Sequence, residues 1–180
     1  DDNWKLNLNF NYQNLRSDNF RGIKDLLGAK FANNLDPFGN DQPFDLDNSE
    51  TKVYKGDRTQ YSYKLYRQTY ALNASTEVDL PRWNVIASAY GSHSESYRDG
   101  DFRNHFYADN SKGKSDTYRF FNAGLKGKIT YKIDGRNFLS YSGTFFSVAP
   151  TLNEIFVNPR VSDFTIPELS NQIINSNELS

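Results

Sequence analysis

The chain has 180 residues, no cysteine and no methionine, and a formal net charge of −1 at pH 7. The lack of cysteine excludes disulfides, thiolate metal sites and cysteine nucleophiles, and the near-neutral charge argues against a nucleic-acid-binding surface. Aromatic residues make up 16% of the chain although its mean hydropathy is −0.78. We find no signal peptide and no apolar run near the roughly 20 residues of a spanning helix, so any membrane crossing would use strands.

Alternation of apolar and polar residues predicts five β-strands. In residues 4–13 every even position is apolar and every odd position is polar. The predicted strands are residues 4–13, 60–79, 83–97, 117–133 and 137–148. In the second strand the apolar phase switches, which predicts a β-bulge near Leu65 and Tyr66. The third strand has a less regular pattern because Ile86 and Tyr90 fall on its polar side.

The predicted connections alternate between long and short. Long polar segments cover residues 14–59, 98–116 and 149–177, whereas residues 79–82 and 134–136 form tight links. Outer-membrane barrels have this order, with long loops outside and short turns on the periplasmic side. A soluble β-sandwich, the alternative, gives no reason for it.

Aromatic residues fall at the predicted strand ends, with Trp4, Trp83 and Tyr131 at the short-turn edge and Tyr12, Tyr70 and Phe121 at the long-loop edge. The ten steps from Phe121 to Tyr131 span about 33 Å of strand, and a tilt of roughly 40° reduces this to about 25 Å, the height of the apolar band of such barrels. We therefore predict an all-β fold, an antiparallel transmembrane β-barrel. Five strands and a sixth beginning near Glu178 cannot close, so we expect the chain to be a fragment of a larger barrel.

Several segments, in a consistent order, resemble TonB-dependent receptors of the Bacteroidetes outer membrane. Residues 131–139 (YKIDGRNFL) resemble the family's TYKINGRNYL hairpin, and residues 148–160 (VAPTLNEIFVNPR) are similar to its RAP…AFVSPR segment. Residues 167–169 (PEL) and 174–179 (INSNEL) resemble its VPDL…EKIYS return, and residues 23–28 and 56–63 resemble its loop segments. Val148 stands where that pattern has arginine, so no role of that arginine carries over.

The resemblance implies a barrel of about 22 strands, an N-terminal plug and energy supplied through TonB. The plug domain is not present in these residues. The implied partners are the lipid bilayer, TonB, a small-molecule or oligomeric nutrient and a surface lipoprotein, with no nucleic acid. The implied location is the outer membrane of a Gram-negative bacterium, with the chain as a multi-pass part of the barrel.

His93 and His105, the two histidines, lie in or near the predicted second long loop with Glu95, Asp99 and Asp101 nearby. A metal site or a protease is one interpretation, and solvated loop side chains are the other, which we favour. Spacing alone cannot define a Ser-His-Asp arrangement.

Two acidic stretches suggest a cation loop. Asp99-Gly100-Asp101 begins like one, but Arg103 stands where an EF-hand needs Asp or Asn. A second cluster lies in the first long loop and consists of Asp36, Asp41, Asp45, Asp47 and Glu50. Calcium binding is an alternative, and a solvated acidic loop is the expectation.

The first long loop also has helical spacing at Ile23, Leu26, Leu27 and Phe31, which predicts a short helix over the barrel mouth. On the polar side of the fourth strand, Lys126, Lys128 and Lys132 could line a path for an anionic solute, although contact with water or a plug is the more usual arrangement.

We predict no catalytic, metal-binding or cofactor-binding residue and no cofactor, and the sequence leaves the substrate-binding residues open. The expected function is active import of a scarce or large nutrient such as a siderophore, cobalamin, an oligosaccharide or a peptide. The alternatives are a passive porin-like or structural barrel and, less favoured, an outer-membrane barrel enzyme, which needs a catalytic cluster at the rim.

Overall fold

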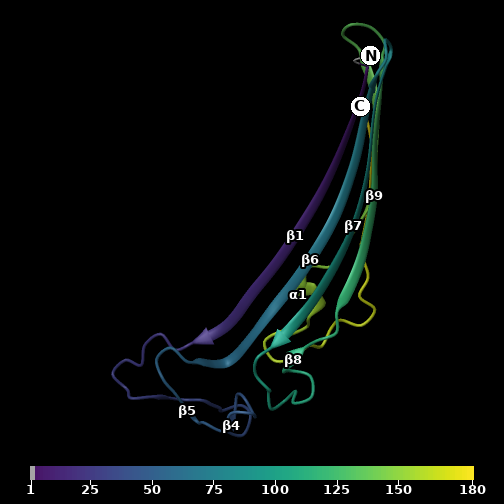
Figure 1. Ribbon diagram of the computed structural model, residues 1–180. Coiled ribbons are helices and arrows are strands. Elements are labelled where there is room, and N and C mark those ends of the chain that lie inside the picture. The colour runs from purple at the N-terminus through teal and green to yellow at the C-terminus, as the bar shows by residue number, and fades with distance from the viewer. Residues whose placement is uncertain (1–2) are drawn as a thin grey trace.

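The computed structural model describes residues 3–180, and its main feature is one long, curved antiparallel sheet (Figure 1). The strand order is β1-β6-β7-β9-β10-β11, and β8 adds to β7. The strands of this sheet are β1 (Trp4–Gly22), β6 (Arg58–Asp79), β7 (Trp83–Gly100), β8 (Gly113–Lys114), β9 (Tyr118–Lys132), β10 (Phe138–Val148) and β11 (Gln172–Leu179). The loops contain the small pairs β2 (Ala32–Asn33) with β5 (Lys52–Val53) and β3 (Leu35–Asp36) with β4 (Gln42–Pro43), and one helical turn, α1 (Leu152–Ile155). The all-β, antiparallel part of the prediction is confirmed.

Short turns lie at one end of the sheet and long loops at the other (Figure 1). The β6–β7 turn is closed by the Leu80 N–H donating to the Trp83 carbonyl at 2.7 Å. In the β9–β10 turn, Asp134 Oδ1 accepts the N–H groups of Arg136 and Asn137 at 2.8 and 2.9 Å. Three segments emerge at the opposite end, which we name the first loop (residues 23–57), the second loop (residues 101–117) and the third loop (residues 149–171). The predicted alternation of long and short connections is therefore present.

Strand register places the apolar residues in continuous rows. One row runs across five strands through Leu8, Ala74, Ala89, Leu125 and Phe145. One residue further along, the row on the opposite face runs through Asn9, Asn73, Tyr90, Gly124 and Phe146. Because side chains alternate between faces, the same register builds an apolar face and a polar face. We use these two names below.

The apolar face is open to its surroundings and not packed on a core. Leu8 is 69% exposed, and the exposed apolar side chains of this face also include Trp4, Leu6, Phe10, Tyr12, Tyr70, Leu72, Phe121, Leu125, Ile129, Tyr141 and Phe145. Aromatic pairs mark both ends of the band, with ring centroids 5.0 Å apart for Tyr12–Tyr70 and 4.7 Å apart for Trp83–Tyr131. β1 and β11 are the two edges of the sheet, which does not close on itself.

Several strand limits differ from the prediction. β1 continues to Gly22 and not to residue 13, β7 reaches Gly100, and β11 begins at Gln172 inside the loop predicted for residues 149–177. In β1 the ladder continues with polar pairs such as Asn14 with Gln68. Beyond the apolar band most residues of β1 are polar, so the alternation of apolar and polar residues ends there. The backbone pairing of β1 with β6 continues.

The β-bulge predicted near Leu65 and Tyr66 is wrong. Register is continuous there, with Leu65 opposite Arg98 and Tyr66 opposite Tyr97. The irregularity lies instead where Phe20 and Arg21 face residues 59–62, next to Gln60, whose φ is +65°. The apolar phase switches because the third loop covers the polar face at this end. A buried cluster forms there from Tyr63 and Leu65 of the sheet and Ile155 and Phe156 of the third loop.

The helix predicted from Ile23, Leu26, Leu27 and Phe31 is also wrong. The segment forms a turn in which the Ala29 N–H donates to the Leu26 carbonyl at 2.9 Å. Leu27 is 94% exposed and has a φ of +49°, followed by Gly28 at +90°. Most helical stability in proteins comes from packing of the apolar side, and here Leu27 and Phe31 of that side stay exposed. Within residues 3–180 no helix has the length and apolarity needed to cross a membrane.

Candidate functional site: the loop end of the sheet

The first and second loops are joined by backbone and ionic contacts. The Leu46 N–H donates to the Arg103 carbonyl at 2.8 Å, and the Arg103 N–H donates to Asp45 Oδ1 at 3.0 Å. Asp47 accepts a hydrogen bond from Lys112 Nζ at 2.6 Å and forms an ion pair with Arg103, whose Nε lies 2.8 Å from Asp47 Oδ1. The hydrogen bond from Lys112 holds the pKa of Asp47 below its ordinary value, and the same bond raises the pKa of Lys112. These contacts hold the two loops together as one body.

The third loop packs on the polar face through the cluster around Phe156. The Tyr118 ring stands edge-on to the Phe156 ring, with centroids 5.8 Å apart. At the start of α1, the Thr151 N–H donates to Glu154 at 2.7 Å, which caps the turn and lowers the pKa of Glu154. The third loop also reaches the second, since the Asp163 N–H donates to the Asn110 carbonyl at 2.9 Å. All three loops are thus connected.

Two strand arginines fasten the third loop to the sheet, and one of them also binds the second loop. Arg98 is 1% exposed and donates from Nε to the Pro159 carbonyl at 2.7 Å and from Nη1 to the Ser111 carbonyl at 2.6 Å. Arg67 donates to the Pro150 carbonyl at 2.7 Å. Charged hydrogen bonds of this kind are the stronger ones in proteins. The sequence prediction did not identify these arginines. For Arg98 the signal was a long cation that follows Ser92, Ser94 and Ser96 on one face of β7.

The two histidines lie in different environments. His93 is on β7, on the apolar face between Tyr70 and Phe121, and not in the second loop. Its Nε2 lies 3.4 Å from Glu95, which also accepts from Arg119 Nε at 2.8 Å. His105 is in the second loop with 7% of its side chain exposed, so the prediction that it is solvated is wrong. Asp36 and the turn around Gly39 cover it.

The predicted acidic stretches are largely engaged by protein donors. Asp101 accepts from Ser62 Oγ at 2.6 Å and Lys64 Nζ at 2.8 Å, and Arg58 lies 3.4 Å away. Asp45 and Asp47 bind donors of the second loop, as described above. In the part of the chain that the structure describes, no group of three or more His, Cys, Asp or Glu side chains is placed to hold a metal ion.

The three lysines of the fourth predicted strand lie on the polar face of β9. Lys132 donates to Asp79 at 2.6 Å next to the β6–β7 turn. Lys126 and Lys128 are exposed and pair with Ser88 and Ile86 of β7. They line the polar face nearer the short turns, away from the third loop.

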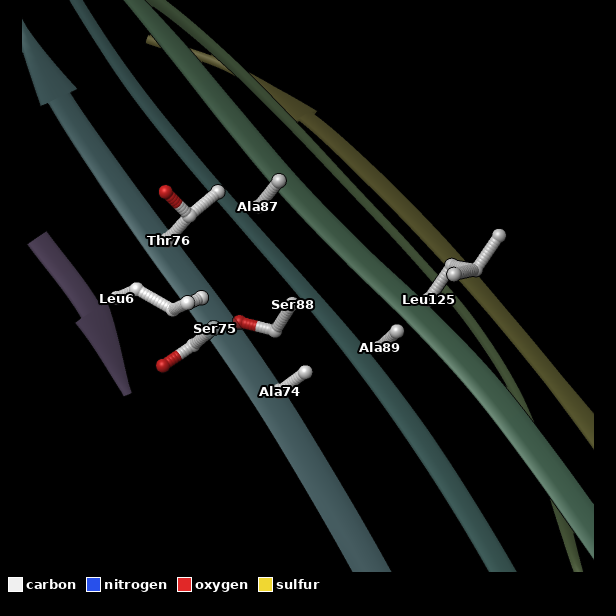
Figure 2. A pocket seen from close by; sticks show the side chains of 8 residues that line it. All are labelled: Leu6, Ala74, Ser75, Thr76, Ala87, Ser88, Ala89 and Leu125. Atoms are coloured by element: carbon white, nitrogen blue, oxygen red, sulfur yellow. The ribbon is translucent and has the colours of Figure 1, made fainter. Parts of the chain in front are cut away.

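One hollow lies in the apolar face and another lies at the loop end of the sheet. In the apolar face, a hollow of about 230 Å³ lies where alanines of β6 and β7 meet, between Leu6 and Leu125 (Figure 2). At the loop end, a polar hollow of about 360 Å³ is lined by Asn34, Asp45, Asn48, Glu50, Lys52, Val53, Tyr54, Asp57, Arg58 and Phe102. The first hollow offers mainly apolar contact, whereas the second offers carboxylates, amides and aromatic rings to a polar ligand.

Neither a protein-family model, nor a curated protein, nor a solved structure matches this chain. Its function must therefore be inferred from the sheet and the loop end.

Proposed function

We propose that this chain is part of the wall of a transmembrane β-barrel in the outer membrane of a Gram-negative bacterium. In this proposal the strands cross the bilayer, the apolar face meets lipid and the polar face lines the interior. Strands outside residues 3–180 would pair with the free edges of β1 and β11, because an open edge in lipid leaves backbone groups unpaired.

The observation that carries the proposal is the apolar face itself. It is continuous over the strands of one sheet, is bounded by aromatic pairs at both ends and, among the described residues, has no element packed on it. Large continuous exposed apolar patches are rare on soluble monomeric proteins and mark a membrane or partner surface. Outer-membrane barrels have a lipid-facing apolar band between two aromatic girdles, and their long loops lie at one end only.

We further propose that the whole protein is a TonB-dependent transporter of a scarce or large nutrient. The three connected loops would form part of its ligand-side surface. In support, the loop end is ordered by ionic and backbone contacts and holds the polar hollow near Tyr54 and Phe102. Import would depend on binding and gated passage, with the plug and TonB contributing from outside these residues.

Placement in lipid can be tested with single cysteines, because the chain has none of its own. We choose Leu125→Cys on the apolar face and Lys126→Cys beside it on the polar face of β9, in the full-length protein reconstituted in vesicles with any other cysteine replaced. A fluorophore attached to the Leu125→Cys protein should be quenched by nitroxide-bearing lipids, and one attached to the Lys126→Cys protein should not. Equal quenching of the two labelled variants would contradict the proposed orientation.

Transport is tested separately, with the full-length protein in cells that have or lack TonB. The proposal expects tight binding of one nutrient and uptake that stops without TonB. Porin-like conductance of the intact protein in planar bilayers would instead favour a passive channel.

A further inference from the structure

The buried side chain of His105 joins the second loop to the first. It is 7% exposed and packs against the turn at residues 36–41 of the first loop. The fit is close, because a Cβ placed on Gly39 would overlap His105 Nε2. The Phe106 ring covers the imidazole, with centroids 4.1 Å apart.

The imidazole of His105 lacks hydrogen-bond partners from residues 3–180 in this position. Neither ring nitrogen of His105 has a hydrogen-bond partner among the described residues. The nearest charged group is Asp36, whose Oδ2 lies 3.5 Å from Nε2 and whose side chain is 15% exposed. Asp36 Oδ1 is occupied by the Phe38 N–H at 3.0 Å, so Oδ2 is the oxygen that faces the ring. Buried polar groups without a partner are uncommon and call for a physical reason.

Other charged groups lie on the loops that pack together around His105. Asp47 is engaged by Arg103 and Lys112, and Asp45 accepts from the backbone of Arg103 and Asp47. The other acidic residues of the three loops are Asp25, Asp41, Glu50, Asp57, Asp101, Asp109, Asp116, Glu154, Asp163 and Glu168. Within the described part of the chain, His105 is the one ion-pair partner that Asp36 has.

We propose that His105 and Asp36 form a proton-dependent latch between the first and second loops. With a neutral imidazole, the closed arrangement leaves the largely buried Asp36 carboxylate without an opposite charge, which disfavours that arrangement. A protonated imidazole donates to the Asp36 carboxylate and forms a buried ion pair, which favours it. Histidine is the side chain whose ordinary titration falls between pH 5 and 8, so mild acid closes the latch and mild alkali loosens it.

The latch does not depend on the proposed transport function. If that function holds, the latch sets how far two of the ligand-side loops separate at a given external pH. If the protein transports nothing, the distance between the two loops still responds to protons. Its test therefore uses distance and not uptake.

The experiment places nitroxide labels at Phe38→Cys in the first loop and Asp109→Cys in the second, both exposed positions. The full-length protein, with any other cysteine replaced, is measured by pulsed electron paramagnetic resonance at about pH 5.5 and about pH 8, on either side of the histidine titration. We expect a narrow distance distribution in acid and a second, longer population in alkali.

Three variants decide the outcome. His105→Gln and Asp36→Asn keep the approximate shape of each side chain but remove the titrating pair, and each should abolish the pH response. His93→Gln, on the apolar face of β7, is the matched control and should retain it. A pH response that persists in His105→Gln or Asp36→Asn, or a wild-type protein whose loop distance does not change with pH, would overturn the latch. An unchanged thermal midpoint of the full-length variants would show that they remain folded.

Discussion

Replacing Leu8 by arginine tests whether the apolar face meets lipid. Leu8 lies midway along the band of β1, four residues from Trp4 and four from Tyr12, and is 69% exposed. Arginine on the lipid face of a barrel costs about 2–4 kcal/mol at the bilayer midplane and about 0–1 kcal/mol near the interfaces. Because Leu8 sits at the centre of the band, we expect the full-length Leu8→Arg protein to lose about 2–4 kcal/mol of unfolding free energy in lipid vesicles.

The matched control is the next residue. Asn9→Arg places the same charge on the same strand and at nearly the same height, but on the polar face, where Asn9 pairs with Asn73. We expect it to cost less than about 1 kcal/mol. Both proteins are unfolded reversibly in guanidinium, and the free energy is read from tryptophan fluorescence. Equal losses for the two variants, or a larger loss for Asn9→Arg, would refute the assignment of the two faces.

Three other predictions concern the loop end. Arg98→Met removes the hydrogen bonds to the Pro159 carbonyl of the third loop and to the Ser111 carbonyl of the second loop. Because one of the two holds the third loop, we expect docking of that loop to weaken by about 1.5–3 kcal/mol, read as faster cleavage of residues 157–168 by protease while the strands stay protected. Ile155→Ala empties part of the buried cluster and should cost about 2–5 kcal/mol of third-loop docking, measured by hydrogen exchange of residues 149–171. Asp47 has a lowered pKa in the folded protein. Its link to Lys112 therefore stabilises the loops at pH values above the ordinary carboxyl pKa, and this stabilisation is lost as the pH falls through the lowered pKa. Hydrogen exchange should show the first and second loops separating in strong acid, and the Asp47→Asn protein should show that separation already at neutral pH.

The sheet was largely predictable from the sequence because its signal is local. In residues 4–13 the alternation depends only on neighbours along the chain, and the same holds for β9 and β10, whose ends were predicted to within one residue. β1 was predicted too short for a physical reason. Beyond Tyr12 most residues of the strand are polar and its two apolar residues, Leu15 and Phe20, fall on opposite faces, so the alternation ends although the backbone remains paired with β6.

The loop end was not predictable in the same way because its contacts are distant and polar. Asp47 and Lys112 are 65 residues apart, and Asp36 meets His105 only after the two loops fold towards each other. No spacing or period in the sequence records such a pair. His105 was expected to be solvated because isolated loop histidines usually are, and only the backbone turn at Gly39 and the ring of Phe106 make it an exception.

One signal of the loop end was present in the sequence and was misinterpreted. The apolar phase of β6 changes between Leu65 and Tyr70, and alternation alone allows two explanations: an inserted residue, or a change in what covers each face. The neighbouring strand distinguishes them. Opposite Arg67 and Thr69, β7 carries Ser96 and Ser94, both fully buried, and small side chains on a buried face leave room for another segment to approach. A phase change beside a run of small residues thus indicates a covered polar face, and the long third loop was the segment available to cover it.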